Sequence, residues 1–156
     1  MGIKVDGDFN ALIVGLTQEG QRVMKNASRR MAQEAERIRT LAIDYAPVDT
    51  HGIEESIKIE RYQAPTFGSR VEFYVYVDGG HIAADGTPVG EYAYYQHEGL
   101  VRMKGGGWGY NWHPGPATLE KMASLGVFCG PKFLERAADE RESEIEESIF
   151  NAIKDS

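Results

Sequence analysis

Apolar residues recur every three to four positions along two long stretches of the chain, which is the pattern of helices that bury one face. The first stretch contains Val23, Met24, Ala27, Met31, Ala35, Ile38, Leu41 and Ala42. Pro47 is expected to end this helix, because the residue before a proline avoids helical geometry. The second stretch follows Gly130 and contains Phe133, Leu134, Ala137, Ala138, Ile145, Ile149, Ala152 and Ile153. Pro131 is expected at the first position of this helix, which tolerates proline.

Shorter helical segments are expected at three other places. Asp8 is a candidate cap for a helix that carries Phe9, Leu12, Ile13 and Leu16. Asp49 and Thr50 offer caps for a short turn that leads to Ser56. Ile53 and Ile57, four positions apart, are expected to pin this turn to the core. A weaker pattern over residues 117–123 predicts one or two helical turns.

Strict alternation marks two strands. Val71, Phe73, Val75 and Val77 alternate with Glu72, Tyr74, Tyr76 and Asp78, which predicts a strand with one aliphatic and one aromatic, polar face. A weaker alternation begins at Ile57, and Gly68 and Ser69 are expected to belong to the hairpin connection between the two strands. Ile3 and Val5 form a short extended start. Residues 92–97, YAYYQH, are expected to form a compact aromatic strand, with Tyr94 and Tyr95 on opposite faces.

These elements predict one α+β domain over residues 1–156. A long N-terminal amphipathic helix and a C-terminal helix are expected to pack on a small, mainly antiparallel sheet. Twelve of the 18 glycines lie between residues 79 and 130. Within that stretch, residues 103–117 are expected to form a flexible loop rich in glycine and aromatic residues.

Composition narrows the class of protein. The 156 residues carry a formal net charge of −7 and have a pI near 5.1, which disfavours a non-specific nucleic-acid binder. The longest apolar run, residues 11–14, is far shorter than a membrane helix requires. Asp6 and Asp8 stand where a signal peptide would be apolar. Cys129 is the single cysteine and cannot form an internal disulfide, which fits a reducing compartment. We therefore expect a soluble, acidic, intracellular protein with no membrane partner.

The residues that carry chemistry do not form a recognised catalytic or metal motif. His51, His81, His97 and His113 are at least sixteen residues apart, and none has a second ligand at zinc-site spacing. Cys129 precedes a helix and is expected to be a small buried residue. Two acidic pairs, Glu54-Glu55 and Glu146-Glu147, are expected to be solvated. We therefore expect no enzyme activity, no metal and no cofactor. One alternative is a small metal-dependent hydrolase that uses His97 and Glu98, with His113 or Cys129.

Aromatic residues are the more informative candidates. Trp108, Tyr110 and Trp112 alternate with other residues in the glycine-rich segment. They either fold back over the core of the domain or anchor a partner surface, where Trp and Tyr are enriched. We expect subunit or partner contacts at Tyr94, Tyr95, Trp108, Tyr110 and Trp112.

Three motifs occur in order along the chain. APVDT at residues 46–50 is followed by IxxSI at 53–57, then by YAYYQHEG at 92–99, and then by GPKFLxxA at 130–137. This ordered set resembles the tail-component proteins of long-tailed bacteriophages, also called neck or tail-completion proteins, whose patterns are APVDTGxLxxSI, YAxYVExG and PFLxxA. His51 stands where the family has glycine, and one extra residue separates the tyrosines from Glu98. The matching positions are architectural: Pro47, Asp49, Thr50, Ser56, Glu98, Gly99, Pro131, Phe133 and Leu134.

The resemblance implies a structural virion protein at the head–tail junction. Copies would form a homo-oligomeric ring that joins the connector or portal side to the tail tube or tail-terminator protein, with DNA only passing through the channel. The protein would be found in the neck or tail of the virion, and in the host cytoplasm during assembly. The other class left open is a small host-encoded binding module, which gene neighbourhood would distinguish, because a neck protein lies among capsid and tail genes.

Overall fold

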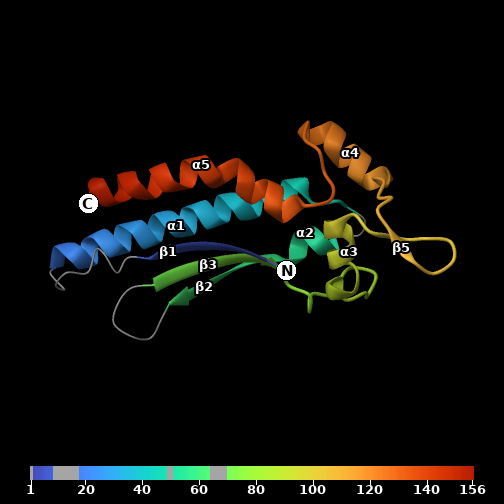
Figure 1. Cartoon of the computed structure of the whole chain (residues 1–156), viewed down its shortest axis with the longest axis horizontal. Helices are drawn as coiled ribbons and strands as arrows, with labels where there is room; N and C mark the ends of the chain where they lie inside the picture. Colours follow the sequence, from blue (N-terminus) through green and yellow to red (C-terminus); the bar gives the residue numbers. More distant parts are fainter. Residues whose placement is uncertain (1, 9–17, 49–50, 64–69) are drawn as a thin grey trace.

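The computed structural model describes residues 2–8, 18–48, 51–63 and 70–156. The expected helix over residues 9–16 and the expected caps Asp49 and Thr50 lie outside these residues. Within the described part, the chain has the expected α+β architecture, with two long helices and a small antiparallel sheet (Figure 1).

The sheet has three antiparallel strands in the order β1-β3-β2. These are β1 (Gly2–Asp8), β2 (Ile57–Gln63) and β3 (Arg70–Val77). Ile59 of β2 lies opposite Val75 of β3, and Gly2 of β1 lies opposite Tyr76. Alternation sets the orientation of β3, because Val71, Phe73, Val75 and Val77 are all buried. The strand predictions for residues 57–62 and 71–77 are confirmed.

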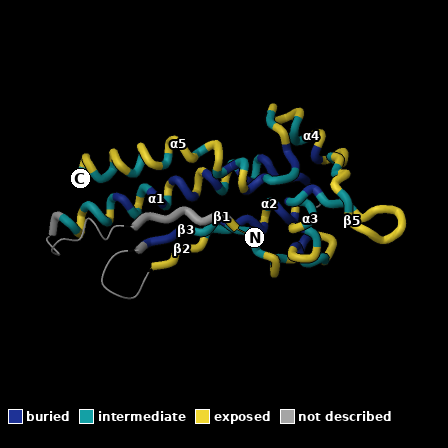
Figure 2. The backbone as a smooth tube through the Cα atoms, viewed as in Figure 1, coloured by how far each residue is buried: buried dark blue, intermediate teal, exposed yellow. Residues whose placement is uncertain are grey.

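Helix α1 (Gln18–Tyr45) lies between the sheet and helix α5 (Phe133–Lys154), so the molecule has three layers along much of its length (Figure 1). The apolar stripe of α1 is buried, and its fully enclosed members include Ala27, Met31, Ala35, Ile38 and Ala42 (Figure 2). Helix α5 runs antiparallel to α1. Ser148 of α5 bonds Arg30 of α1, while Glu140, nearer the start of α5, bonds Tyr45 at the end of α1. Both helix predictions from periodicity are confirmed.

A carboxylate is buried in the seam between these helices. The Glu34 side chain has no solvent exposure, and Arg141 donates to its Oε2 over 2.8 Å from Nη2. Arg37 and Ser148 donate to Oε1 at 2.6 and 3.0 Å. Burial by itself raises the pKa of Glu34, but these hydrogen bonds and the nearby Arg141 and Arg37 charges outweigh it and hold the pKa below its ordinary value.

The remaining elements gather at one end of the molecule. They are α2 (Gly52–Ser56), the 3₁₀ turn η2 (Val89–Glu91), α3 (Ala93–Glu98), β4 (Val101–Arg102), β5 (Trp108–Gly109) and α4 (Pro116–Leu125). The short turn leading to Ser56 and the helix near residues 117–123 are therefore confirmed. Both Ile53 and Ile57 are buried, as expected. None of the helices in the described ranges has the length and apolar character needed to cross a membrane.

Two predictions for this end are wrong. Residues 92–97 are not a strand: Ala93–Glu98 form α3, and Gly99 ends it at φ +71°. A short aromatic run has no clear periodicity, so length and composition alone misassign it. Pro131 is not the first helical residue, because α5 begins at Phe133 and Lys132 occupies the N-cap position at φ +58°. Residues 103–117 form a loop over most of their length, but Trp108 and Gly109 form β5, which pairs with β4 as a hairpin, and α4 begins at Pro116.

Candidate assembly surface

The aromatic residues predicted as an interface divide into two groups. Trp108 of β5 stacks on Tyr95 of α3, with ring centroids 3.8 Å apart and an interplanar angle of 3°. Trp112 donates from Nε1 to Gln96 Oε1 over 2.8 Å and meets the Phe128 ring edge-on. These contacts fix the β4–β5 hairpin against α3, so three of the five predicted residues contribute to the protein's own packing.

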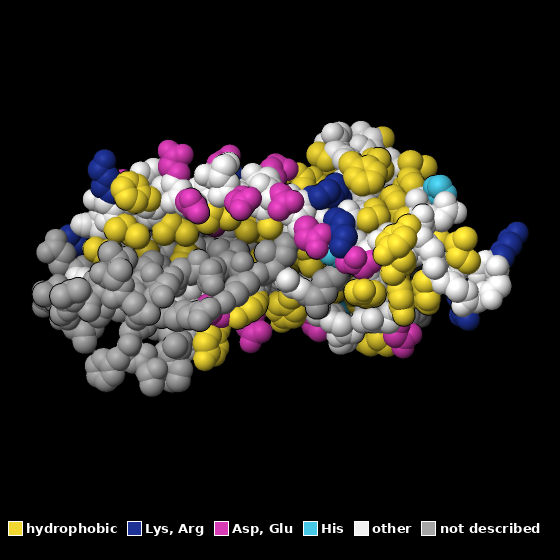
Figure 3. Space-filling view, viewed as in Figure 1, with side chains coloured by type: hydrophobic (Ala, Val, Ile, Leu, Met, Phe, Trp, Pro, Cys, Tyr) yellow, Lys and Arg dark blue, Asp and Glu magenta, His cyan; other side chains and the backbone are white. Residues whose placement is uncertain are grey.

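The other two project outward. Tyr110 is 84% exposed and Tyr94 is 55% exposed. Tyr94 also packs edge-on against Tyr95, at 5.7 Å between centroids. Several other large apolar side chains are exposed on the same end of the molecule: Met103, Leu119, Leu125 and Phe128. Figure 3 shows hydrophobic side chains gathered over α4 and the hairpin. We call Tyr94, Met103, Trp108 and Tyr110 the aromatic end.

A hollow of about 250 Å³ is lined by residues of α2, α3 and α4. Its walls include Val48, Ile53 and Val101, together with the Trp112 ring. Thr118 also lines this hollow. Its hydroxyl accepts a hydrogen bond from the Val48 N–H and donates one to the Val48 carbonyl oxygen, both over 2.9 Å. Polar side chains, Gln96 and His113 among them, line the hollow together with the apolar ones, and the Thr118 hydroxyl there is already satisfied.

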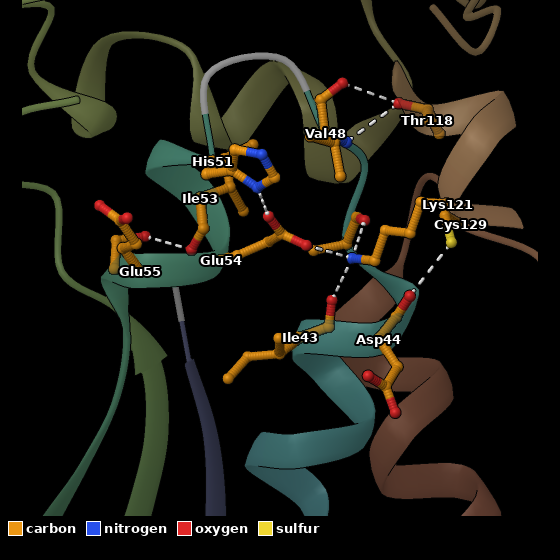
Figure 4. Close-up of polar contacts among 12 residues, drawn as sticks. Ile43, Asp44, Val48, His51, Ile53, Glu54, Glu55, Thr118, Lys121 and Cys129 are labelled. Atoms are coloured by element: carbon orange, nitrogen blue, oxygen red, sulfur yellow. Dashed lines mark hydrogen bonds and ion pairs between the residues drawn. The ribbon is translucent and has the colours of Figure 1, made fainter. Parts of the chain in front are cut away.

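Helix α4 holds the first residues of the APVDT motif, Ala46 to Val48 (Figure 4). Lys121 of α4 donates to the carbonyl oxygens of Ile43 and Ala46 at 2.5 and 2.9 Å. These carbonyls lie at the end of α1, where helical partners run out. The same ammonium group pairs with Glu54 Oε1 of α2 at 2.5 Å. Lys121 thus joins three helices, and Glu54 is not the solvated residue predicted from sequence; Glu55, Glu146 and Glu147 are exposed.

Replacing Lys121 with methionine is expected to lower the free energy of unfolding by about 2 kcal/mol. The substitution leaves the Glu54 carboxylate without its ammonium partner and two α1 carbonyls without their donor. Chemical denaturation measures the change, with Lys25→Met on an exposed part of α1 as the control. Equal effects of the two substitutions would show that Lys121 does not join the helices.

The second and third motifs meet at the start of α5. Lys132 N–H donates to the His97 carbonyl at 2.7 Å, and Lys132 Nζ pairs with Glu98 Oε2 at 2.6 Å. Gly99 lies against the Pro131 ring, where an added Cβ would approach Pro131 Cγ to 3.0 Å. The hydrogen bond from Lys132, with a second from His97, holds the pKa of Glu98 below its ordinary value.

Of the residues proposed for a hydrolase, His97 and Cys129 are buried, whereas Glu98 is partly exposed and His113 is exposed. His97 is 3% exposed, its ring packs edge-on against Phe133, and its Nδ1 lies 2.9 Å from Glu98 Oε1. Its Nε2 is buried, with no hydrogen-bond partner among the residues described. Cys129 is fully buried as predicted, its thiol donates to the Asp44 carbonyl at 3.1 Å, and burial raises its pKa.

The other histidines have separate surroundings. His51 binds Glu54, His81 lies 3.3 Å from Glu55, and His113 lies 3.1 Å from Asn111. His51 occupies the N-cap position of α2 at φ +59° and makes no side-chain cap hydrogen bond there. No group of three or more His, Cys, Asp or Glu side chains with metal-binding geometry occurs in the described ranges.

Sequence reasoning missed Lys121 and Thr118, because a polar residue on a short helix is normally solvated. The one available signal was the apolar sequence of residues 46–48, because a buried segment outside a helix must satisfy its backbone groups through some polar side chain.

Comparisons of the chain with protein-family models, with curated proteins and with solved structures found no match.

Proposed function

We propose that this chain is a structural assembly protein of a bacteriophage particle, a neck or tail-completion subunit. Copies form a ring at the head–tail junction and join the connector side to the tail tube or tail-terminator protein. DNA passes through the channel, and no covalent chemistry is involved. The acidic net charge of −7 suits that position, because like charge keeps DNA from adhering to the ring.

The observation that carries the proposal is the convergence of the three motifs. Residues 97–99 contact residues 131–132 through the Lys132 bonds and the Gly99–Pro131 approach. Gly130 N–H donates to the Tyr45 carbonyl at 2.8 Å, which brings the third motif to the end of α1, beside the first. Three motifs that are far apart in the sequence therefore meet in one region of the structure. This supports treating them together as the signature of one family.

Two further features suit a ring subunit. The outer strands β1 and β2 each pair on one side only within the described sheet, so each offers an edge to a neighbour. The aromatic end carries large exposed side chains on α3 and at the β4–β5 hairpin, and these are costly to leave in water on a monomer. A ring needs two different surfaces per subunit, because its contacts are head-to-tail.

The surroundings of His97 and Cys129 also favour a structural role over hydrolysis. A general base must reach the substrate within hydrogen-bond distance, and a reactive thiol needs a lowered pKa. His97 is enclosed between α3 and α5, and burial moves the pKa of Cys129 in the opposite direction. In this arrangement the two side chains serve packing.

The proposal is tested in the phage that encodes the chain. Removing the gene is expected to leave filled heads and separate tails in electron micrographs, and antibody to the protein is expected to label the neck of wild-type virions. Complementation with a Tyr94→Ser/Tyr110→Ser variant is expected to restore joining poorly, at least about tenfold less infectious virus, because both side chains are exposed and available to a partner.

The control is Gln33→Ser, which changes an exposed polar side chain on α1, outside the aromatic end and both outer strands. It should complement as well as the wild-type gene. Infectious virus assembled without the protein, or hydrolytic turnover by the purified chain that is lost in His97→Ala, would overturn the proposal.

A further inference from the structure

The outer face of α5 is exposed to solvent and carries mainly negative charge. Its exposed side chains recur at helical spacing and include Asp139, Glu142, Glu146, Glu147 and Phe150. None of these four carboxylates has an ion-pair partner within the described part of the chain. Phe150 is 65% exposed beside them.

The cations of α5 do not neutralise this face. Arg141 turns inward to Glu34, and Arg136 turns to backbone carbonyls and stacks over the Tyr45 ring at 4.9 Å. Lys154 follows Phe150 at the end of the helix. The outer face of α5 therefore keeps an uncompensated negative charge and one large apolar side chain.

The β4–β5 hairpin has the complementary character. Arg102 and Lys104 are exposed on it, and no acidic residue occurs between residues 99 and 119. Neither cation has an ion-pair partner among the described residues. Met103 and the highly exposed Tyr110 supply apolar surface next to these charges. In an acidic chain, this is a local basic and apolar projection.

The two surfaces cannot meet within one molecule. The hairpin lies at one end of the long axis, and α5 runs toward the opposite end (Figure 1). Figure 3 shows the same separation, with acidic side chains along α5 and basic ones on the projecting hairpin. Charge complementarity between opposite ends of an elongated subunit fits a contact between copies.

We infer that the β4–β5 hairpin of one copy docks on the outer face of α5 of a second copy. Arg102 and Lys104 face the carboxylates there, and Tyr110 and Met103 pack near Phe150. The contact is head-to-tail, because each subunit gives one surface and receives the other, and repetition closes a ring when the rotation between copies permits. The inference rests on the self-association in the proposed function and names the surfaces that carry it.

Charge reversal tests the contact on the purified full-length chain. Self-association is measured by sedimentation velocity at low and high salt. Arg102→Glu/Lys104→Glu is expected to weaken association at least about tenfold, and Glu142→Lys/Glu146→Lys is expected to do the same, because each replaces attraction with repulsion. Mixing the two variants is expected to restore association between them. High salt is expected to weaken the wild-type contact, since exposed charges are screened.

Lys25→Glu/Arg29→Glu, which reverses two exposed cations on α1, is the matched control and should associate like the wild type. A zero-length carbodiimide cross-link between Lys104 and Glu146, detected in a mixture of ¹⁴N and ¹⁵N chains, would place the two surfaces together across copies. Isotope mixing identifies it as intermolecular.

Two results would overturn the inference. One is association that both reversals leave unchanged. The other is binding of duplex DNA that Arg102→Glu/Lys104→Glu abolishes while association persists, which would assign the hairpin to DNA. Neither result bears on the proposed location in the virion, which is tested independently by antibody labelling and by the phenotype of the null mutant.

Discussion

Phe133→Ala is expected to lower the free energy of unfolding by about 4 kcal/mol, within the range for removing a buried phenylalanine side chain. Phe133 is fully buried at the first position of α5 and meets the His97 ring edge-on at 4.9 Å. The cavity left by alanine would loosen α3 from α5 at the point where Lys132 bonds His97 and Glu98. Such a loss is a large part of the total stability of an ordinary domain.

Urea denaturation followed by circular dichroism measures the loss. Phe150→Ala on the same helix is the control, because its side chain is mostly exposed, and its effect is expected to stay within about 0.5 kcal/mol. Phe133→Leu should fall between the two. A Phe133→Ala protein as stable as the Phe150→Ala protein would mean that the start of α5 is not anchored as the structure has it.

Glu34→Ala is expected to cost about 3 kcal/mol of unfolding free energy. The substitution leaves Arg141, which is mostly enclosed, without the carboxylate that accepts two of its hydrogen bonds. It also removes the acceptor of Ser148. Replacing both partners, as Glu34→Leu/Arg141→Met, should cost less than replacing Glu34 alone, because no uncompensated charge stays buried. Glu36→Ala, an exposed neighbour on α1, is the control.

The Glu34 carboxylate also makes the free energy of unfolding depend on pH. The folded protein holds the pKa of Glu34 below its ordinary value of 4.5, so the unfolded chain binds more protons as pH falls through that region. Glu98 shifts in the same direction. The stability that these groups contribute is present above about pH 4.5 and is lost as pH falls below it. Melting temperatures between pH 7 and pH 3 should fall less steeply in Glu34→Gln, and an unchanged slope would contradict the assignment.

The periodicity of apolar residues was sufficient to predict the helices and strands that bury one face. Helices α1 and α5 each cover a partner layer with one stripe, and β3 buries every second residue against α1, so the sequence carried the pattern directly. Strand β1 was expected only as an extended start, and its pairing with β3 is a long-range contact that periodicity does not encode.

The candidate site was harder to predict because its details depend on partners distant in the sequence. Glu34 shares the helical spacing of Met31 and Ile38 on α1, but a charged residue is normally assigned to the solvated side of a helix, so its burial was missed. Residues 92–98 gave no signal of helical spacing, because a helix of six residues barely completes a period. The sequence left open whether Trp108 folds back on the domain or anchors a partner. The pairing of β4 with β5 places its ring on Tyr95 of α3.

The pairing of α1 with α5 has a consequence for the order of folding. On the ribosome, α1 is complete long before α5 is made, so the side of α1 that α5 will cover stays in water while the sheet and the short helices emerge. Glu34 belongs to that side, and its charge is well solvated until Arg141 arrives to enclose it. Because Arg141 lies 107 residues after Glu34, the carboxylate can accept the Arg141 hydrogen bonds only after most of the chain has been synthesised.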